Sequence, residues 1–174
     1  EAKSPPATQG RVSVVVPLYN HARYVADSVR SALAQGPILR EVVVVDDGST
    51  DGSAEALLSA CGDDPRLVLW SQPNRGAHAA INAGLLRATG EVLAVLNSDD
   101  VYAPGRLDRL VAALDADPAA DLAATGLRFL DGDGAPAENP WYEEAVAFYR
   151  ACGDLGTALV NGNFLMTTSN LAFR

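Results

Sequence analysis

Two apolar runs of this chain each end in a pair of aspartates. Val42–Val45 leads into Asp46-Asp47, and Leu93–Leu96 leads through Asn97-Ser98 into Asp99-Asp100. A short, continuous apolar run is typical of a strand buried on both faces, as in a parallel sheet. Because α/β sheets bind ligands beyond the carboxyl ends of their strands, the two pairs predict a ligand site at one edge of a sheet.

The adjacent carboxylates Asp99 and Asp100 are not expected to chelate one ion together. Successive strand residues point to opposite sides, so one carboxylate is expected to bind a metal and the other a ligand hydroxyl. The alternative interpretation is that these aspartates belong to turns or cap helices, which we favour for Asp51. For Asp99 and Asp100 we favour a ligand site, because two charges after a buried strand need a partner.

Four alternations of strand and helix predict an α/β fold with a mostly parallel sheet and flanking helices. The predicted fourth strand ends at Asp99. Asn20 is expected to cap the first helix, and Gly90 is expected to be the left-handed cap of the third. The predicted strands cover 12–16, 42–45, 66–70, 93–99 and 122–130, and the predicted helices cover 24–33, 53–60, 77–88, 104–114 and 141–151, followed by a loop and short strand within 161–174.

Length and charge limit the class of protein. A chain of 174 residues is long enough for one domain with a buried core, and its net charge of -9 argues against a nucleic-acid partner. No stretch is apolar enough to span a membrane. Cys61 and Cys152 lack neighbours at metal-ligand spacing, which favours reduced thiols in a cytoplasmic protein. Attachment to the inner face of a membrane through other segments stays open.

Four motifs, taken in this order, resemble a known family. They are Val14-Val15-Val16-Pro17-Leu18-Tyr19-Asn20, Val44-Val45-Asp46-Asp47-Gly48-Ser49-Thr50-Asp51, Asn74-Arg75-Gly76 with Asn82-Ala83-Gly84, and Asn97-Ser98-Asp99-Asp100. Together they resemble a family 2 glycosyltransferase, which implies the Rossmann-like GT-A fold. The resemblance covers residues 12–114, and residues 168–174 are similar to a later segment of the family.

The resemblance implies an inverting enzyme that moves a sugar from a nucleotide diphosphate donor, most often a UDP sugar, to the hydroxyl of a carbohydrate or lipid-linked acceptor. It also implies a divalent metal, Mn²⁺ or Mg²⁺, bound by Asp100. Asp99 would contact ribose or sugar hydroxyls, and Asp47 would accept a hydrogen bond from the base. The implied nucleotide-sugar-binding residues are Pro17, Tyr19, Asn20, Asp46, Asp47, Asn82, Ser98 and Asp99.

The sequence is expected to divide into three parts. Residues 1–10 are expected to be a disordered leader or linker, residues 11–130 a nucleotide-sugar-binding subdomain, and residues 131–174 the incomplete start of an acceptor-binding part. The family places its general base on a later acidic segment, and no carboxylate here occupies the matching place. We therefore expect the chain to bind donor and metal but to transfer poorly alone.

Two other classes of protein require motifs that this chain lacks, and a third class stays open. A dinucleotide-binding domain needs Gly-x-Gly-x-x-Gly after the first strand, where this chain has Pro17-Leu18-Tyr19-Asn20. A nucleotidyltransferase would favour a glycine-rich phosphate loop with Arg or Lys near that strand, which is also missing. A non-catalytic or degenerate nucleotide- or carbohydrate-binding domain stays open. Arg75 and His78 are interpreted as surface or packing residues.

Overall fold

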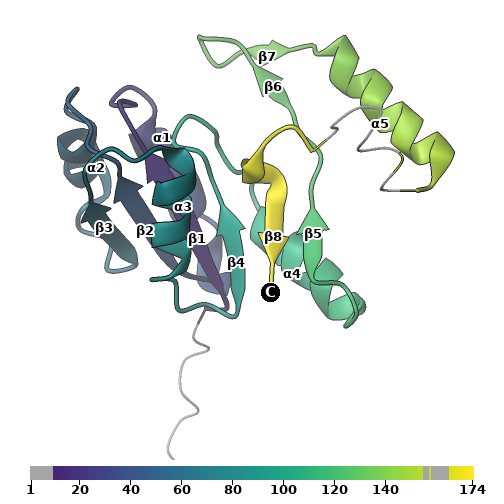
Figure 1. Cartoon of the computed structure of the whole chain (residues 1–174), viewed down its shortest axis with the longest axis horizontal. Helices are drawn as coiled ribbons and strands as arrows, with labels where there is room; N and C mark the ends of the chain where they lie inside the picture. The colour runs from purple at the N-terminus through teal and green to yellow at the C-terminus, as the bar shows by residue number, and fades with distance from the viewer. Residues whose placement is uncertain (1–9, 155–156, 158–164) are drawn as a thin grey trace, which may run out of the picture.

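The computed structural model describes residues 10–154, 157 and 165–174. Its main feature is a six-stranded sheet in the order β3-β2-β1-β4-β8-β5 (Figure 1). Strands β1 to β4 are mutually parallel, whereas β8 is antiparallel to both β4 and β5. The predicted mostly parallel α/β sheet is confirmed. The strands are β1 (Val12–Leu18), β2 (Leu39–Asp46), β3 (Leu67–Ser71), β4 (Val92–Val95), β5 (Leu122–Ala124) and β8 (Leu171–Phe173).

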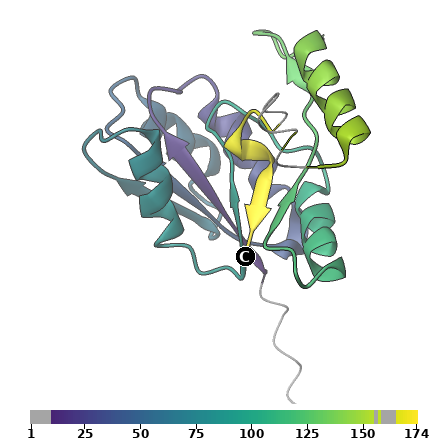
Figure 2. The same cartoon turned by 45° about the vertical axis from the view of Figure 1, so that its right-hand side comes forward.

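Helices cover both faces of this sheet. In the two views, α3 lies on one face, and α1 and α2 lie behind the other (Figures 1 and 2). A small hairpin of β6 and β7 and the helix α5 lie beyond the β5 edge. The elements are α1 (Val25–Leu33), η1 (Gly36–Ile38), α2 (Ser53–Cys61), α3 (Ala77–Leu85), α4 (Arg106–Ala116), β6 (Phe129–Leu130), β7 (Pro136–Ala137), α5 (Pro140–Cys152) and η2 (Thr168–Asn170).

The strands β1 and β2 are buried on both faces, as their unbroken valine runs predict. Alternate residues face opposite sides, so Val14 and Val16 pack in the main core with α1, α2 and α4. On the α3 side, a Cβ added at Gly84 would lie 2.3 Å from Cγ1 of Val15. Only glycine permits α3 to approach the sheet this closely, which gives Gly84 a packing role.

Three local predictions were wrong. Strand β4 ends at Val95, and Asp99 and Asp100 lie in the following turn, so strand alternation does not decide where they point. Asn20 does not cap α1, which begins at Val25. Gly90 does not cap α3, which ends at Leu85. Instead, a Cβ at Gly90 would lie 2.6 Å from the main-chain nitrogen of Ser13, so glycine is needed there for a close approach.

The second half of the chain is less regular than predicted. The single strand expected over 122–130 is two short strands, β5 and β6, and β6 pairs with β7 instead of joining the main sheet. The predicted helix over 141–151 is present as α5. Strand β8 lies between β4 and β5, so the last residues complete the sheet formed by residues 11–130. Most of the predicted leader, residues 1–9, lies outside the described residues, as do residues 161–164 of the final loop.

Candidate functional site

A cleft of about 320 Å³ opens where β1, β2 and β4 end. The parallel register brings these carboxyl ends to one edge, because Leu18 pairs with Asp46, and Val15 pairs with Val95. The loops that follow the three strands and the start of α3 form the walls. The lining residues are Pro17, Leu18, Tyr19, His21, Asp47, Ala77, Ala80, Asn97, Ser98 and Asp99.

The cleft gathers five of the nine residues predicted for the site. Tyr19 and Asp99 are exposed at the cleft, whereas the other three are buried. The remaining four predicted residues do not line it: Asn82 is exposed on α3, Asp46 is the last residue of β2, and Asn20 and Asp100 lie in the adjoining loops. The five predicted residues that line the cleft are Pro17, Tyr19, Asp47, Ser98 and Asp99.

Asp47 organises the loop that precedes α3. Its carboxylate accepts hydrogen bonds from Nε2 of Gln72 at 2.8 Å and from the main-chain nitrogens of Arg75 and Gly76 at 2.9 and 2.7 Å. Burial alone would raise the pKa of Asp47, but these hydrogen bonds outweigh it and lower the pKa below its ordinary value. The side chain is therefore held ionised, and most of its acceptor positions are already used.

Asn20 and Asp51 join the loops after β1 and β2. Asn20 has a left-handed φ of 53°, and its amide oxygen accepts the Thr50 N–H at 2.9 Å. Asp51 accepts the Ala22 N–H at 3.0 Å and also a hydrogen bond from Ser53. These bonds match the turn interpretation of Asp51. Asn20 thus supports the loop that carries Tyr19, instead of capping a helix.

Asp46 has a local role of the same kind. Its Oδ1 accepts the Ser49 N–H at 3.0 Å, and the residue is buried at the end of β2. The two members of the first acidic pair therefore differ, because Asp46 closes a turn, whereas Asp47 reaches the cleft.

Sequence reasoning missed His21. Its side chain lines the cleft, and its Nδ1 is hydrogen-bonded to Oγ of Ser98 at 2.7 Å. The main-chain nitrogen of His21 donates to Oγ of Ser53 at 2.9 Å, which fixes the residue at the loop. The signal was its position directly after Tyr19-Asn20, in the loop that follows a strand ending at the predicted site.

Asp99 and Asp100 are the candidates for a metal site. The Asp99 carboxylate accepts no hydrogen bond from any described residue, and Oδ2 of Asp100 accepts one from Ser169 at 2.6 Å. Across the described ranges, no cluster of three or more His, Cys, Asp and Glu side chains is placed to hold a metal ion. Mg²⁺ usually binds one or two carboxylates together with substrate phosphates and water. A single carboxylate of this pair, together with a phosphate ligand and water, is therefore enough for such an ion.

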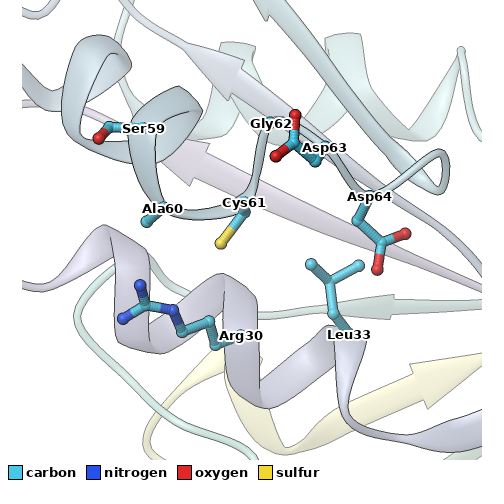
Figure 3. Close-up of a pocket in the computed structure, with 8 residues that line it drawn as sticks. All are labelled: Arg30, Leu33, Ser59, Ala60, Cys61, Gly62, Asp63 and Asp64. Carbon is cyan, nitrogen blue, oxygen red and sulfur yellow. The ribbon is translucent and has the colours of Figure 1, made fainter.

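A second cavity, of about 200 Å³, lies away from these residues, between α1 and the end of α2 (Figure 3). Arg30 and Leu33 come from α1, and Cys61 is the last residue of α2. The sulfur of Cys61 lies 3.9 Å from the carbonyl oxygen of Ala26, and burial raises the pKa of this thiol. None of the predicted site residues lines this cavity.

Among the described residues, no helix is both long enough and apolar enough to cross a membrane.

Comparison with known protein families supports the resemblance given by the motifs. A family model described as glycosyl transferase family 2 matches residues 13–135. ExoO, a succinoglycan biosynthesis protein of Rhizobium meliloti (strain 1021), is 43% identical over 124 residues, which cover 71% of this chain and 35% of that relative. The chain spans only 16–35% of the length of this and two other curated relatives.

Solved structures share the same architecture. S. aureus TarS 1-349 in complex with UDP gives a TM-score of 0.63 at 27% identity, over 73% of this chain and 38% of that one. The mannosyltransferase PcManGT of Pyrobaculum calidifontis, in complex with GDP-Man and Mn²⁺, gives a TM-score of 0.59 at 32% identity, over 71% of this chain and 38% of that one.

Proposed function

Because this chain belongs to glycosyl transferase family 2, we propose that its cleft binds the nucleotide diphosphate sugar used by an inverting glycosyltransferase. The similarity to the two solved glycosyltransferases confirms the GT-A fold predicted from the motifs. The observation that supports the proposal best is the meeting of Tyr19, Asp47 and Asp99 in one cleft at the carboxyl ends of three parallel strands.

We assign a contact in or beside the cleft to each part of the donor. The nucleotide base lies against Pro17 and the exposed ring of Tyr19, whose flat apolar face suits stacking. The loop shaped by Asp47 closes the other side of the base. Asp99 accepts hydrogen bonds from ribose or sugar hydroxyls, and Asp100 holds Mn²⁺ or Mg²⁺. Such a cation would neutralise the charge that builds on the diphosphate leaving group.

The charge of the cleft supports the need for a cation. Its lining includes Asp47 and Asp99 but neither Lys nor Arg among the described residues. A diphosphate entering this cleft is repelled by both carboxylates unless a positive charge lies between them. The net charge of the whole chain, -9, acts in the same direction.

We propose uridine as the base and a growing polysaccharide or lipid-linked carbohydrate as the acceptor. TarS was solved with UDP and with UDP-GlcNAc, whereas PcManGT was solved with GDP-Man, so the two neighbours differ in their base. ExoO is a biosynthesis protein for the polysaccharide succinoglycan.

The general base of the transfer is assigned to residues outside this cleft. Asp47 and Asp99 are the carboxylates among its described lining residues, and both have donor-side roles in the proposal. We therefore expect the 174-residue chain to bind donor and metal without efficient sugar transfer by itself. Robust turnover by the isolated chain would contradict this part.

Calorimetric titration of UDP tests the donor site. We expect binding with Mn²⁺ and little binding with a chelator, and we expect Asp100→Ala to abolish the metal-dependent part while the thermal unfolding curve stays normal. Asp63→Ala is the matched control, since Asp63 is exposed at the second cavity. Titration of GDP in parallel tests the base. Absence of binding of either nucleotide, with or without metal, would contradict the proposal.

A further inference from the structure

Asp100 is held by a part of the chain that lies almost seventy residues away in sequence. Its Oδ2 accepts hydrogen bonds from Oγ of Ser169 at 2.6 Å and from Oγ1 of Thr167 and Nδ2 of Asn97, both at 3.3 Å. No described residue donates a hydrogen bond to Oδ1 of Asp100. One oxygen of the carboxylate is therefore fixed by three donors, and the other remains available to a ligand.

Ser169 connects both ends of the turn that carries this carboxylate. The Ser169 hydroxyl donates to Asp100 and accepts the main-chain N–H of Asn97 at 2.8 Å, so both of its hydrogen-bonding functions are used. Two neighbouring threonines form further hydrogen bonds with the side-chain amide of Asn97. The Thr168 hydroxyl donates to Oδ1 of Asn97 at 3.2 Å, and Nδ2 of Asn97 donates to Oγ1 of Thr167 at 2.9 Å. The turn 97–100 is thus tied to η2 by side-chain hydrogen bonds along its length.

Arg106 fixes Ser169 from the protein interior. The residue is only 7% exposed, and Nη2 donates to the Ser169 carbonyl oxygen at 2.7 Å. Nε donates to Oγ1 of Thr125 at 3.2 Å, and the guanidinium lies 4.1 Å from the ring centroid of Tyr102. Burial lowers the pKa of Arg106.

The buried Arg106 is unfavourable for the stability of the fold, so stability does not explain its presence. Within the described part of the chain, no carboxylate forms an ion pair with Arg106, and its Nη1 has no hydrogen-bond partner. A buried cation without an opposite charge is unfavourable, and an apolar side chain of similar size would avoid this cost. One of the two groups that accept a hydrogen bond from Arg106 is the carbonyl of Ser169, whose hydroxyl holds the Asp100 carboxylate.

We propose that Ser169 is a positioning residue that orients the Asp100 carboxylate so that Oδ1 faces the divalent cation of the donor, with Arg106 fixing Ser169 from behind. The inference rests on the proposed donor and metal site. Metal-binding carboxylates are themselves usually hydrogen-bonded, and loss of such a supporting bond typically weakens metal affinity about 10- to 100-fold.

The arrangement also couples two parts of the protein. Two of the three residues that hold Asp100, Thr167 and Ser169, lie directly before β8, the strand that completes the sheet between β4 and β5. Because linkage is reciprocal, a cation that favours the oriented carboxylate must also stabilise η2 against local opening. We expect slower amide hydrogen exchange over 165–170 when Mn²⁺ and UDP are both present.

The experiment compares Mn²⁺ affinity in the presence of UDP for the wild-type chain, Ser169→Ala and Ser169→Thr. We expect Ser169→Ala to raise the Kd for Mn²⁺ about 10- to 100-fold, with metal-free UDP binding unchanged, and Ser169→Thr to recover much of the affinity. Ser59→Ala, at an exposed serine of α2, is the control. If Ser169→Ala does not fold, Thr167→Val removes a weaker bond to Asp100 and is expected to shift the affinity less, in the same direction.

The outcomes separate this inference from the proposed function. Unchanged Mn²⁺ affinity in Ser169→Ala, with metal-dependent binding lost in Asp100→Ala, would overturn the positioning role and leave the donor site intact. Equal losses of metal-free and metal-dependent UDP binding would indicate a structural role and would also overturn it. Absence of metal-dependent binding in the wild-type chain would overturn the proposed function and this inference together.

Discussion

Residues 11–116 and residues 117–174 are held in place by different forces. Among the described residues, the buried apolar side chains lie between Val12 and Leu114, apart from Ala172 on β8. Helix α4 buries five of its 11 residues, whereas α5, with 13 residues, buries none. The first region therefore has a hydrophobic core, and the second depends mainly on contacts of another kind.

Directed hydrogen bonds supply many of those contacts. Arg174 donates to the Leu114 carbonyl oxygen at 2.7 Å, and η2 is bonded to the turn 97–100. The hydrophobic effect is non-directional, whereas a hydrogen bond depends on the position of one atom of one side chain. The core therefore fixes where the strands end, whereas individual hydroxyl groups fix the orientation of the Asp100 carboxylate.

Removal of a core leucine should have the largest effect. Leu107 is 0% exposed, and Leu130 is 51% exposed. We expect Leu107→Ala to lower the free energy of unfolding by about 2–5 kcal/mol, because it leaves a cavity. Leu130→Ala should change it by less than about 0.5 kcal/mol, since the side chain is largely in water already. Urea unfolding measures both, and similar losses would refute the division into two regions.

Gly84 tests the close approach of α3 to the sheet. Gly84→Ala should lower the free energy of unfolding by about 3 kcal/mol, because the new Cβ would overlap the side chain of Val15, which is packed on all sides. Gly132→Ala is the control, because a Cβ at Gly132 meets nothing within 4 Å. Urea unfolding of both variants measures the difference. Equal stability of the two would show that α3 moves freely on the sheet.

Asp47 should stabilise the fold in a pH-dependent way. Its folded pKa is lowered, so its contribution is fully present above the unfolded pKa of about 3.9 and is lost as the pH falls through the folded value. At pH 7 we expect Asp47→Asn to lower the free energy of unfolding by about 2 kcal/mol. The NH2 group of the new asparagine would face main-chain N–H donors and could not accept their hydrogen bonds. The difference in the free energy of unfolding between the variant and the wild type, measured by urea unfolding, should decrease as the pH falls. A difference that stays constant with pH would contradict this account.

Much of the fold could be predicted from the sequence because the signals are local and strong. The valine runs of β1 and β2 and the aspartates that follow them gave the sheet and the edge at which the cleft lies. Gly90 was misplaced because the same residue type serves helix caps and close backbone contacts, and only the packed structure distinguishes them. The strand over 122–130 was wrong because a short apolar pattern does not reveal which strand it pairs with.

The site was less predictable than the fold. Tyr19, Asp47 and Asp99 follow predicted strands, so their meeting at one edge could be foreseen. The hydrogen bonds of Asp100 could not, because Thr167 and Ser169 return to it from far along the chain. A buried Arg106 gives no sequence signal either, since arginine in the first turn of an amphipathic helix is usually exposed.

Tyr142 tests how independent the second region is, with the smallest expected effect. Its hydroxyl accepts the Leu127 N–H at 2.8 Å, and its ring packs edge-on against Phe129 at 5.3 Å between centroids. Tyr142→Phe should lower the stability of this region by about 0.5–1.5 kcal/mol, because the partly buried N–H of Leu127 loses its acceptor. If the second region opens separately from the core, amide exchange will speed up around α5 and β6 while the global unfolding midpoint stays unchanged. A matching shift of the global midpoint would instead show that both regions unfold together, and the contrast between them would then concern packing alone.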